Sequence, residues 1–468
     1  MSDGLRKPHV ALLPLYLELY DRTLPHLLQR QEGFLASVSA LLRSPGIEVT
    51  VLPVCRTRMQ VAEAVSSAEK QGVDGIVTLH LAYSPSLEAA ESLVGTSLPV
   101  LMLDTTPASS LGPGFNTDAV LENHGIHGVQ DLASVLRRRG RAYSVIAGAT
   151  NDPGLPTRVM SWARAARARR WLQGLRVAQI GGSFMGMGDF EVTEQRLRKT
   201  LGPTVVEIEL SALAELSRKV TEEEIAGEKA RDLEAFDCSA CEGGCWDRSN
   251  RIGLGLRRAL VEAGTHAFSM NFASFDRSIG LFTVPFLEAS KAMARGMGYA
   301  GEGDVLTASL VGVLNSCYGP TTFTEMFCPD WAGGRVFMSH MGECNPALAE
   351  DTPRLVEKPY AFGPAENPAV LMFPLRPGPA ALVNAAPSEG DSLTIIAADV
   401  RVCDAGLEPG LPDMPHFWIE PPSGAVAQFL ERYSEAGGTH HLALTPGLAC
   451  GELKPLADML GCEFVLVP

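Results

Sequence analysis

Four short stretches in the second half of the chain combine carboxylates and imidazoles in loop-like settings bounded by glycine. They are AGEGD with Glu302 and Asp304, TFTEMF with Glu325, FMSHMGE with His340, and GGTHHLAL with His440 and His441. Two carboxylates and two imidazoles suit a divalent cation such as Mn²⁺ that keeps coordination sites open for substrate oxygens. A pair of carboxylates beside a substrate can also move a proton. The pattern therefore predicts a metal site with acid/base chemistry.

Each of these residues is also compatible with an ordinary structural role. Glu302 could cap a helix, His340 could be a hydrogen-bonded core histidine, and the tandem His440 and His441 could end a strand. Spacing along the chain does not show that the four stretches meet in space. The metal site and the structural roles both stay open at this point.

A literal G-x-G-x-x-G, the segment GMGYAG at 296–301, stands directly before Glu302. A dinucleotide fingerprint needs a strand before it, because that strand aims the phosphates at the start of the next helix. The preceding segment VPFLEASKAMAR instead has the spacing of an amphipathic helix. We therefore predict a helix end at these glycines, followed by a tight turn that presents Glu302.

A second glycine-rich stretch, LRVAQIGGSFMGMGDFEVTEQRLRKTLG, does predict a strand, a glycine-rich turn and a helix. Its glycine spacing is not that of the fingerprint. No acidic residue ends a clean second strand at the distance expected for ribose binding. This stretch therefore offers only weak support for a nucleotide site.

The segment CSACEGGC brings three cysteines together, Cys238, Cys241 and Cys245. A zinc site would need a fourth ligand, and the nearest following histidine is His266. No second C-x-x-C pair occurs in the chain. We therefore predict a loop with incidental thiols here.

The composition limits the classes of partner. The 468 residues carry 39 basic and 54 acidic side chains, a formal net charge of −15, which argues against nucleic acid or an anionic membrane as the main partner. The N-terminal segment HVALLPLYL is better explained as a first strand than as a signal peptide, because Pro14, Glu18 and Asp21 interrupt the apolar run. With ten scattered cysteines, we expect reduced thiols in a cytoplasmic protein.

The elements that position these residues fall into three predicted domains. Apolar runs alternate with helical patterns through the first third and again after residue 170, which predicts two doubly wound, open parallel sheets. Short apolar runs between prolines and glycines, such as AVLMFPL, ALVNAA and LTIIAADVRV, predict a C-terminal antiparallel β-barrel-like domain. The predicted boundaries are 1–170, 171–320 with the first metal carboxylate, and 321–468 with the remaining ligands.

Taken in order, GYAGEGD, TFTEMF, VFMSHMGECNPALA and AGGTHHLAL resemble the L-arabinose isomerase family, within the wider L-arabinose/L-fucose isomerase group. Weaker correspondences reach upstream to VTLHLAYSP, NHGIHGVQDL and HAFSMNF. The resemblance thus covers nearly the whole chain, and it implies an aldose–ketose isomerase that works through an enediol intermediate.

The resemblance also implies roles for individual residues. A divalent metal, usually Mn²⁺, would be held by Glu302, Glu325, His340 and His441. Glu302 and Glu325 would also be the catalytic acid/base pair. The remaining substrate-binding residues would be His127, Phe272, Met185 and His440. Of these, His127 would reach the substrate of a neighbouring subunit, so the resemblance implies a homo-oligomer (trimer-based, tetramer or hexamer) with active sites at subunit interfaces.

The sugar-facing segments depart from the family. LPLYLELYD stands where the family has a Gly-Ser-Gln-x-x-Tyr-Gly segment, and IGGSFMGMGDF replaces a Phe-Gly-Asp-Asn-Met-Arg turn. The substrate is therefore expected to be a pentose, hexose or deoxy-sugar, not L-arabinose in particular. Two alternatives remain: a non-catalytic sugar-binding protein on the same fold, and a nicotinamide-dependent dehydrogenase suggested by QIGGSFMGMGD.

Overall fold

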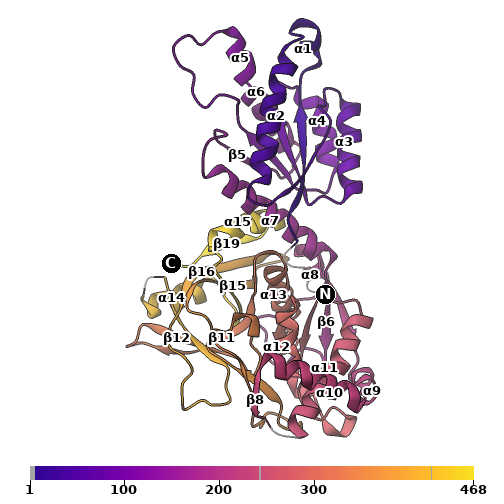
Figure 1. Ribbon diagram of the computed structural model, residues 1–468, viewed down its shortest axis with the longest axis vertical. Coiled ribbons are helices and arrows are strands. Elements are labelled where there is room, and N and C mark those ends of the chain that lie inside the picture. The colour runs from indigo at the N-terminus through magenta and orange to yellow at the C-terminus, as the bar shows by residue number, and fades with distance from the viewer. Residues whose placement is uncertain (1–5, 242–243, 423) are drawn as a thin grey trace. The chain divides into compact units, whose positions relative to one another are not determined.

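The computed structural model describes residues 6–241, 244–422 and 424–468, and the chain divides into two compact units, Arg6–Arg170 and Trp171–Pro468. Figure 1 shows parallel sheets flanked by helices and, within the Trp171–Pro468 unit, a β-rich region. The prediction of two doubly wound sheets followed by an antiparallel barrel is confirmed. Among the described helices, none is long and apolar enough to cross a membrane.

The Arg6–Arg170 unit is built on a five-stranded parallel sheet with the order β2-β1-β3-β4-β5. Its strands are β1 His9–Leu15, β2 Glu48–Val51, β3 Gly75–His80, β4 Val100–Asp104 and β5 Ser144–Ala147. Its helices are α1 Glu18–Thr23, α2 Leu27–Arg43, α3 Arg58–Gln71, α4 Ser86–Gly95, α5 Thr117–Asn123 and α6 Ile126–Arg138. The central strands are almost wholly buried, as expected of parallel strands covered on both faces. An arginine-rich segment after β5 forms α7, Leu155–Gly174.

A second parallel sheet, with the order β10-β9-β6-β7, begins the Trp171–Pro468 unit. Its strands are β6 Arg176–Ile180, β7 Thr204–Ile208, β9 Ala267–Met270 and β10 Gly298–Gly301. The associated helices are α8 Glu194–Thr200, α9 Leu210–Arg218, α10 Glu222–Ala235, α11 Gly244–Glu262, α12 Phe286–Ala294 and α13 Val305–Cys317, with short 3₁₀ turns η1 Phe272–Ser274 and η2 Arg277–Ile279.

The glycine-rich segment 296–301 differs in part from its prediction. Helix α12 does end before Gly296, which has a left-handed φ of +90°. The tight turn predicted for the rest of the segment is wrong, because Gly298–Gly301 forms strand β10 beside β9. The turn comes after it, at Glu302 and Gly303. The four-residue strand escaped detection because glycine, which is depleted in strands, stands at both of its ends.

Six antiparallel strands then close into a barrel, since β15 pairs with both β18 and β16 at the ends of the series β15-β18-β11-β12-β17-β16. These strands are β11 Thr322–Asp330, β12 Arg335–Ser339, β15 Gly378–Pro387, β16 Leu393–Val402, β17 His416–Glu420 and β18 His441–Pro446. Strand β19, Glu463–Leu466, adds to β16 in parallel. The remaining elements are α14 Val426–Glu435, α15 Lys454–Leu460, η3 Pro346–Leu348 and η4 Cys450–Leu453.

One run assigned to the C-terminal β domain lies outside the barrel. The AVLM segment forms β14, Ala369–Met372, in a small mixed sheet with β13, Arg354–Glu357, and β8, Asp237–Ala240. Because β8 comes from much earlier in the chain, local periodicity could not reveal this partner. The cysteine segment also departs from a simple loop, since Cys238 lies in β8 and Cys245 in α11, while residues 242–243 lie outside the described residues.

Candidate functional site

Glu302 lies at the carboxyl end of β10 in an unusual backbone conformation. Its φ of +64° makes it the one non-glycine residue with a left-handed φ among those described. Such a conformation costs about 1–3 kcal/mol and persists only where the surroundings enforce it. Here the Phe184 N–H donates to the Glu302 carbonyl at 2.8 Å. A Cβ on the next residue, Gly303, would approach the Gly182 carbonyl oxygen to 2.2 Å, so the turn is packed too tightly for a larger residue.

Glu325 lies on a central barrel strand between two strands that supply imidazoles. On one side Glu325 of β11 pairs in register with His441, the first residue of β18. On the other side it pairs with Ser339, the last residue of β12, and His340 follows directly. Directly opposed residues in an antiparallel pair have Cβ atoms about 5 Å apart. Register therefore places Glu325 beside His441, and His340 follows directly after the residue that pairs with Glu325 on the other side.

The acidic and imidazole side chains converge. The Nε2 atom of His441 lies 3.0 Å from Glu325 Oε1 and 3.4 Å from Glu302 Oε2. His340 Nε2 lies 3.5 Å from the same Glu325 oxygen. His440 Nε2 lies 3.5 Å from Glu302 Oε2 and 3.8 Å from Glu325 Oε1. Ligand atoms of Glu302, Glu325, His440 and His441 all fall within 4.8 Å of one another, the one such group found among the described residues.

Two further carboxylates lie within hydrogen-bond distance of the Nδ1 atoms of the buried imidazoles. Asp304 lies 2.9 Å from Nδ1 of His441, and Glu343 lies 2.8 Å from Nδ1 of His340. An ionised carboxylate can only accept, so each Nδ1 carries the hydrogen. The Tyr299 hydroxyl donates in turn to Glu343. With Nδ1 protonated, Nε2 of a neutral ring keeps its lone pair and points to Glu302 and Glu325.

The donor atoms fit a metal ion. The Nε2 atoms of His340 and His441 and the Oε2 atom of Glu302 are buried, and none has a hydrogen-bond partner among the described residues. Buried polar atoms are rarely left without a partner. Carboxylates backing histidines through Nδ1 are also the usual surroundings of metal-binding imidazoles. Carboxylate and imidazole ligands together suit a borderline divalent cation such as Mn²⁺.

Electrostatics keep the two carboxylates ionised. Burial acts to raise the pKa of Glu302, but the neighbouring imidazoles of His440 and His441 outweigh it and hold that pKa well below its usual range. Burial likewise opposes ionisation of Glu325, and the charges of His340 and His441 lower its pKa. Burial depresses the pKa of His441, yet Asp304, Glu302 and Glu325 raise it well above its ordinary value. The site is thus prepared to hold positive charge.

The loop between β6 and α8 covers the cluster. Its Phe190 stacks on the His441 ring with centroids 4.8 Å apart, and its Asp189 accepts from both the backbone and Nδ1 of His440. Phe184 stacks on Phe272, with centroids 5.4 Å apart. Aromatic rings on one side and polar atoms on the other are typical of a small-molecule site.

The remaining predicted substrate residues are distributed differently. Phe272 is linked to the cluster through Phe184. The two rings stack, and the Phe184 N–H donates to the Glu302 carbonyl. Met185 is 93% exposed. His127 lies on α6 of the other unit, where its ring meets that of His124 edge-on at 5.6 Å. The structure therefore brings Glu302, Glu325, His340, His440 and His441 together, whereas His127 does not lie in the same unit.

Sequence reasoning missed the positioning residues. Asp304 was noted as a carboxylate and given no role, and Glu343, Asp189 and Tyr299 were not singled out. The signal for Glu343 was available, since a carboxylate three residues after His340 can turn back to its ring. The partners of His441 and His440 stand 137 and 251 positions away, and local spacing carries no such information.

Comparisons with known proteins match the chain to one family. A family profile described as the L-arabinose isomerase C-terminal domain matches residues 320–463, and one described as the L-arabinose isomerase central domain matches residues 195–317. The chain is 30% identical to an L-arabinose isomerase of Nocardioides sp. over 449 residues, which covers 92% of this chain and 88% of the relative. It is 26% identical to an L-arabinose isomerase of Shouchella clausii, over 90% and 87% of the two chains.

Proposed function

This chain belongs to the L-arabinose isomerase family and is a sugar isomerase, an intramolecular oxidoreductase, and we propose that it converts an aldose to a ketose at a divalent metal site. The observation that carries the proposal is the convergence of Glu302 and Glu325 on Nε2 of His441. A protein that only binds a sugar has no need of two ionised carboxylates beside three imidazoles.

In the proposed site Glu302, Glu325, His340 and His441 hold the metal, with Mn²⁺ the best match to these ligands. When bound, the ion would polarise the two substrate oxygens and stabilise negative charge on them. The proximity of ligand atoms alone would favour His440 over His340 as the fourth ligand. We assign His340 because its Nε2 is buried without a hydrogen-bond partner among the described residues, whereas His440 is bound to Asp189 and 38% exposed at its side chain.

The two glutamates carry the proton transfers in this proposal. Isomerisation moves one hydrogen between C1 and C2 through an enediol and one between the attached oxygens. One carboxylate removes the proton from carbon and returns it to the neighbouring carbon, while the other moves the proton between the oxygens. The lowered pKa values of Glu302 and Glu325 supply the ionised base that the first step requires. Phe190, packed on His441, limits access of water to the cluster.

The substrate is proposed to be a pentose, hexose or deoxy-sugar in a reaction of the L-arabinose to L-ribulose type. The loop that bears Met185 differs from the family pattern, and so does the segment LPLYLELYD, so the sugar itself is open. His127 is proposed to complete a neighbouring subunit's site in a homo-oligomer. A cytoplasmic location is part of the same proposal.

Metal removal tests the proposal. The purified chain is stripped with EDTA, its metal content is measured, and ketose formation is assayed over a panel of pentoses, hexoses and deoxy-sugars. We expect no turnover in the stripped protein and recovery with Mn²⁺ for at least one aldose. Turnover that survives verified metal removal, or no ketose from any sugar with Mn²⁺ present, would contradict the proposed function.

A further inference from the structure

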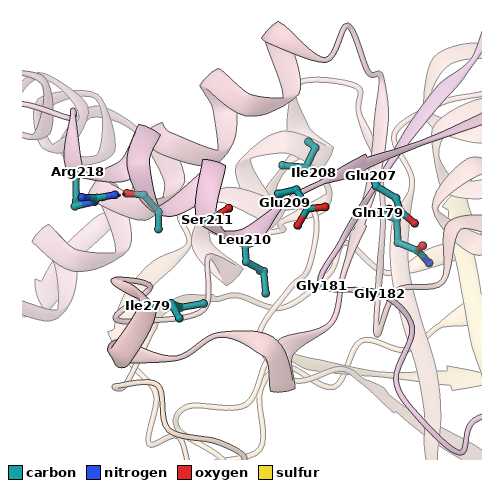
Figure 2. Close-up of a pocket in the computed structure, with 11 residues that line it drawn as sticks. Gln179, Gly181, Gly182, Glu207, Ile208, Glu209, Leu210, Ser211, Arg218 and Ile279 are labelled. Atoms are coloured by element: carbon teal, nitrogen blue, oxygen red, sulfur yellow. Dashed lines mark hydrogen bonds between the residues drawn. The ribbon is translucent and has the colours of Figure 1, made fainter.

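A cavity of about 620 Å³ lies at the carboxyl ends of β6 and β7, and the proposed isomerase chemistry makes no use of it. Figure 2 shows Gly181 and Gly182 on one side, Glu209 near the centre, and Arg218 and Ile279 on the other side. Its volume falls within the roughly 300–1,000 Å³ typical of small-molecule sites. None of Glu302, Glu325 and the three clustered histidines lines it.

The position in the fold is one where open α/β sheets bind ligands. In the order β10-β9-β6-β7 the chain passes from β6 to β7 on one side and then returns to β9 on the other. Ligands of such sheets bind beyond the carboxyl ends of the strands, near this change of direction. Here the turn after β6, the end of β7 and the segment after β9, with Ile279, form the walls.

An acidic residue does end the second strand. The sequence alone gave only weak support for a nucleotide, because no such residue was recognised at the end of this strand. Strand β7 ends at Ile208, with Glu207 and Glu209 on either side, and both glutamates line the cavity. No ion pair or side-chain hydrogen bond is found for either carboxylate among the described residues. A carboxylate at this place in the fold accepts hydrogen bonds from two adjacent ribose hydroxyls.

The other end of the cavity suits a flat ring. Leu210, Ala214 and Ile279 supply apolar walls, and Ile279 is 45% exposed although it is large and apolar. Arg218 lies at the rim, with its Nε 3.4 Å from the carbonyl of Ala214. A guanidinium stacks readily on a heteroaromatic ring.

The turn after β6 offers no cradle for a pyrophosphate. In a dinucleotide site the helix after the first strand points its free N–H groups at the phosphates. Helix α8 starts only at Glu194, well after Gly182, and has seven residues. The side chain of Thr193 already accepts from the Arg196 N–H at its start. The two unpaired glutamates add negative charge, which disfavours a polyphosphate.

We propose that this cavity binds a ribonucleoside, with the ribose hydroxyls on Glu209 and the base between Leu210, Ala214 and Ile279. The cavity recognises the neutral ribose and the base. It does not accommodate a pyrophosphate or a longer phosphate chain. This site is separate from the metal cluster, and the proposal does not depend on the isomerase function.

Calorimetric titration of the full chain, with Mn²⁺ present, tests this proposal. Adenosine and uridine serve as probes, and saturable binding of either at one site per chain supports the proposal. Because 2′-deoxyadenosine lacks one hydroxyl for Glu209, it should bind at least about tenfold more weakly than adenosine. Glu209→Gln should weaken adenosine binding by about the same factor. The Glu209 side chain makes no capping hydrogen bond on α9, so this variant should fold normally.

Glu215→Gln is the matched control. It removes the same charge from α9, the helix that Glu209 precedes, but Glu215 pairs with Lys219 and does not line the cavity, so nucleoside affinity should be unchanged. The proposal is overturned if neither nucleoside binds at millimolar concentration, or if 2′-deoxyadenosine binds as well as adenosine. Tighter binding of NAD⁺ than of adenosine would also overturn it. A change in oligomeric mass in Glu209→Gln, without nucleoside binding to the parent chain, would overturn it too and assign the cavity to a subunit contact.

Discussion

Asp304 and His441 are joined by a 2.9 Å hydrogen bond between residues 137 positions apart in the chain. The bond connects the N-cap residue of α13 to the first residue of barrel strand β18. Asp304 has a second task, because its other carboxylate oxygen accepts from the Thr307 N–H and caps α13. One carboxylate therefore both starts the helix after Glu302 and fixes the ring orientation of His441.

Asp304→Asn separates these two tasks. Asparagine caps helices as well as aspartate does, so α13 should remain intact. Replacing the ionised acceptor by an amide weakens the hold on His441 Nδ1, and changes of this kind typically reduce metal affinity about 10–100-fold. Competition with a fluorescent chelator measures the Mn²⁺ affinity, and circular dichroism checks the fold. An unchanged affinity in a folded Asp304→Asn protein would show that this hydrogen bond does not support metal binding.

His340 and His440 are predicted to differ in their roles. If His340 is a ligand, His340→Asn should reduce Mn²⁺ affinity by at least about 100-fold, because its carboxamide cannot replace the buried Nε2 donor. If His440 faces substrate, His440→Asn should raise KM while Mn²⁺ affinity stays within about threefold. Metal titration and steady-state kinetics on the same two variants measure both effects. The opposite pattern would make His440, not His340, the fourth ligand.

Glu325→Gln tests the acid/base role apart from the fold. Losing a general acid or base typically reduces the rate about 10²–10⁴-fold, and Glu302→Gln should give a loss of the same order. Both changes preserve side-chain size, so the melting temperature should change little. Glu431→Gln on the exposed face of α14 is the control for charge and should retain full activity. Turnover within about threefold of the parent in either active-site variant would remove that residue from the acid/base pair.

The parts of the fold that could be predicted are those specified by local pattern. Strands such as β1 and β3 appear as apolar runs because a parallel strand is buried on both faces, and α7 is rich in alanine and arginine, which favour a helix. Strand β10 was missed, since glycine disfavours strands and its pairing with β9 is a tertiary contact. The domain boundaries at residues 170 and 320 stay predictions.

The residue types of the candidate site were predictable, but their convergence was not. Glu325 and His441 meet because β11 and β18 pair in one register, and Glu302 reaches them only through a strained turn after β10. Neither relationship leaves a local signature. The resemblance to a family suggested the metal ligands Glu302, Glu325, His340 and His441. The contacts of Asp304 and Glu343 with these histidines are visible only in the structure.

Gly301→Ala should displace the His340 ring by steric overlap. A Cβ at position 301 would lie 2.7 Å from Cε1 and 3.0 Å from Nε2 of that ring, so the imidazole has to move. Overpacking of this kind typically costs about 1–3 kcal/mol, and the displaced ring should also weaken metal binding. Gly227→Ala is the control, because a Cβ there meets nothing within 4 Å in the middle of α10. That variant should be more stable by about 0.5–1 kcal/mol. Equal urea midpoints and Mn²⁺ affinities for the two variants would contradict the prediction.

His80 should make the Arg6–Arg170 unit less stable in acid. Burial lowers the pKa of His80 to about 4, only partly opposed by the charge of Asp131, and the ring packs against Gly128 with Nδ1 2.7 Å from the Ser84 hydroxyl. His80 takes up a proton near pH 6.5 in the unfolded chain, but only near pH 4 in the folded chain. The folded state is therefore penalised as the pH falls through this window, by about 3 kcal/mol in all.

His80→Gln removes the titrating group, so the free energy of unfolding should fall less steeply between pH 6.5 and pH 4. The difference in slope from the parent should approach one proton, about 1.4 kcal/mol per pH unit. Hydrogen exchange in the peptide containing β3, measured at a series of pH values, reports on this unit separately from the rest. His26→Gln, at an exposed position, should keep the parent slope. Parallel pH profiles for the parent and His80→Gln would show that His80 is not the group responsible.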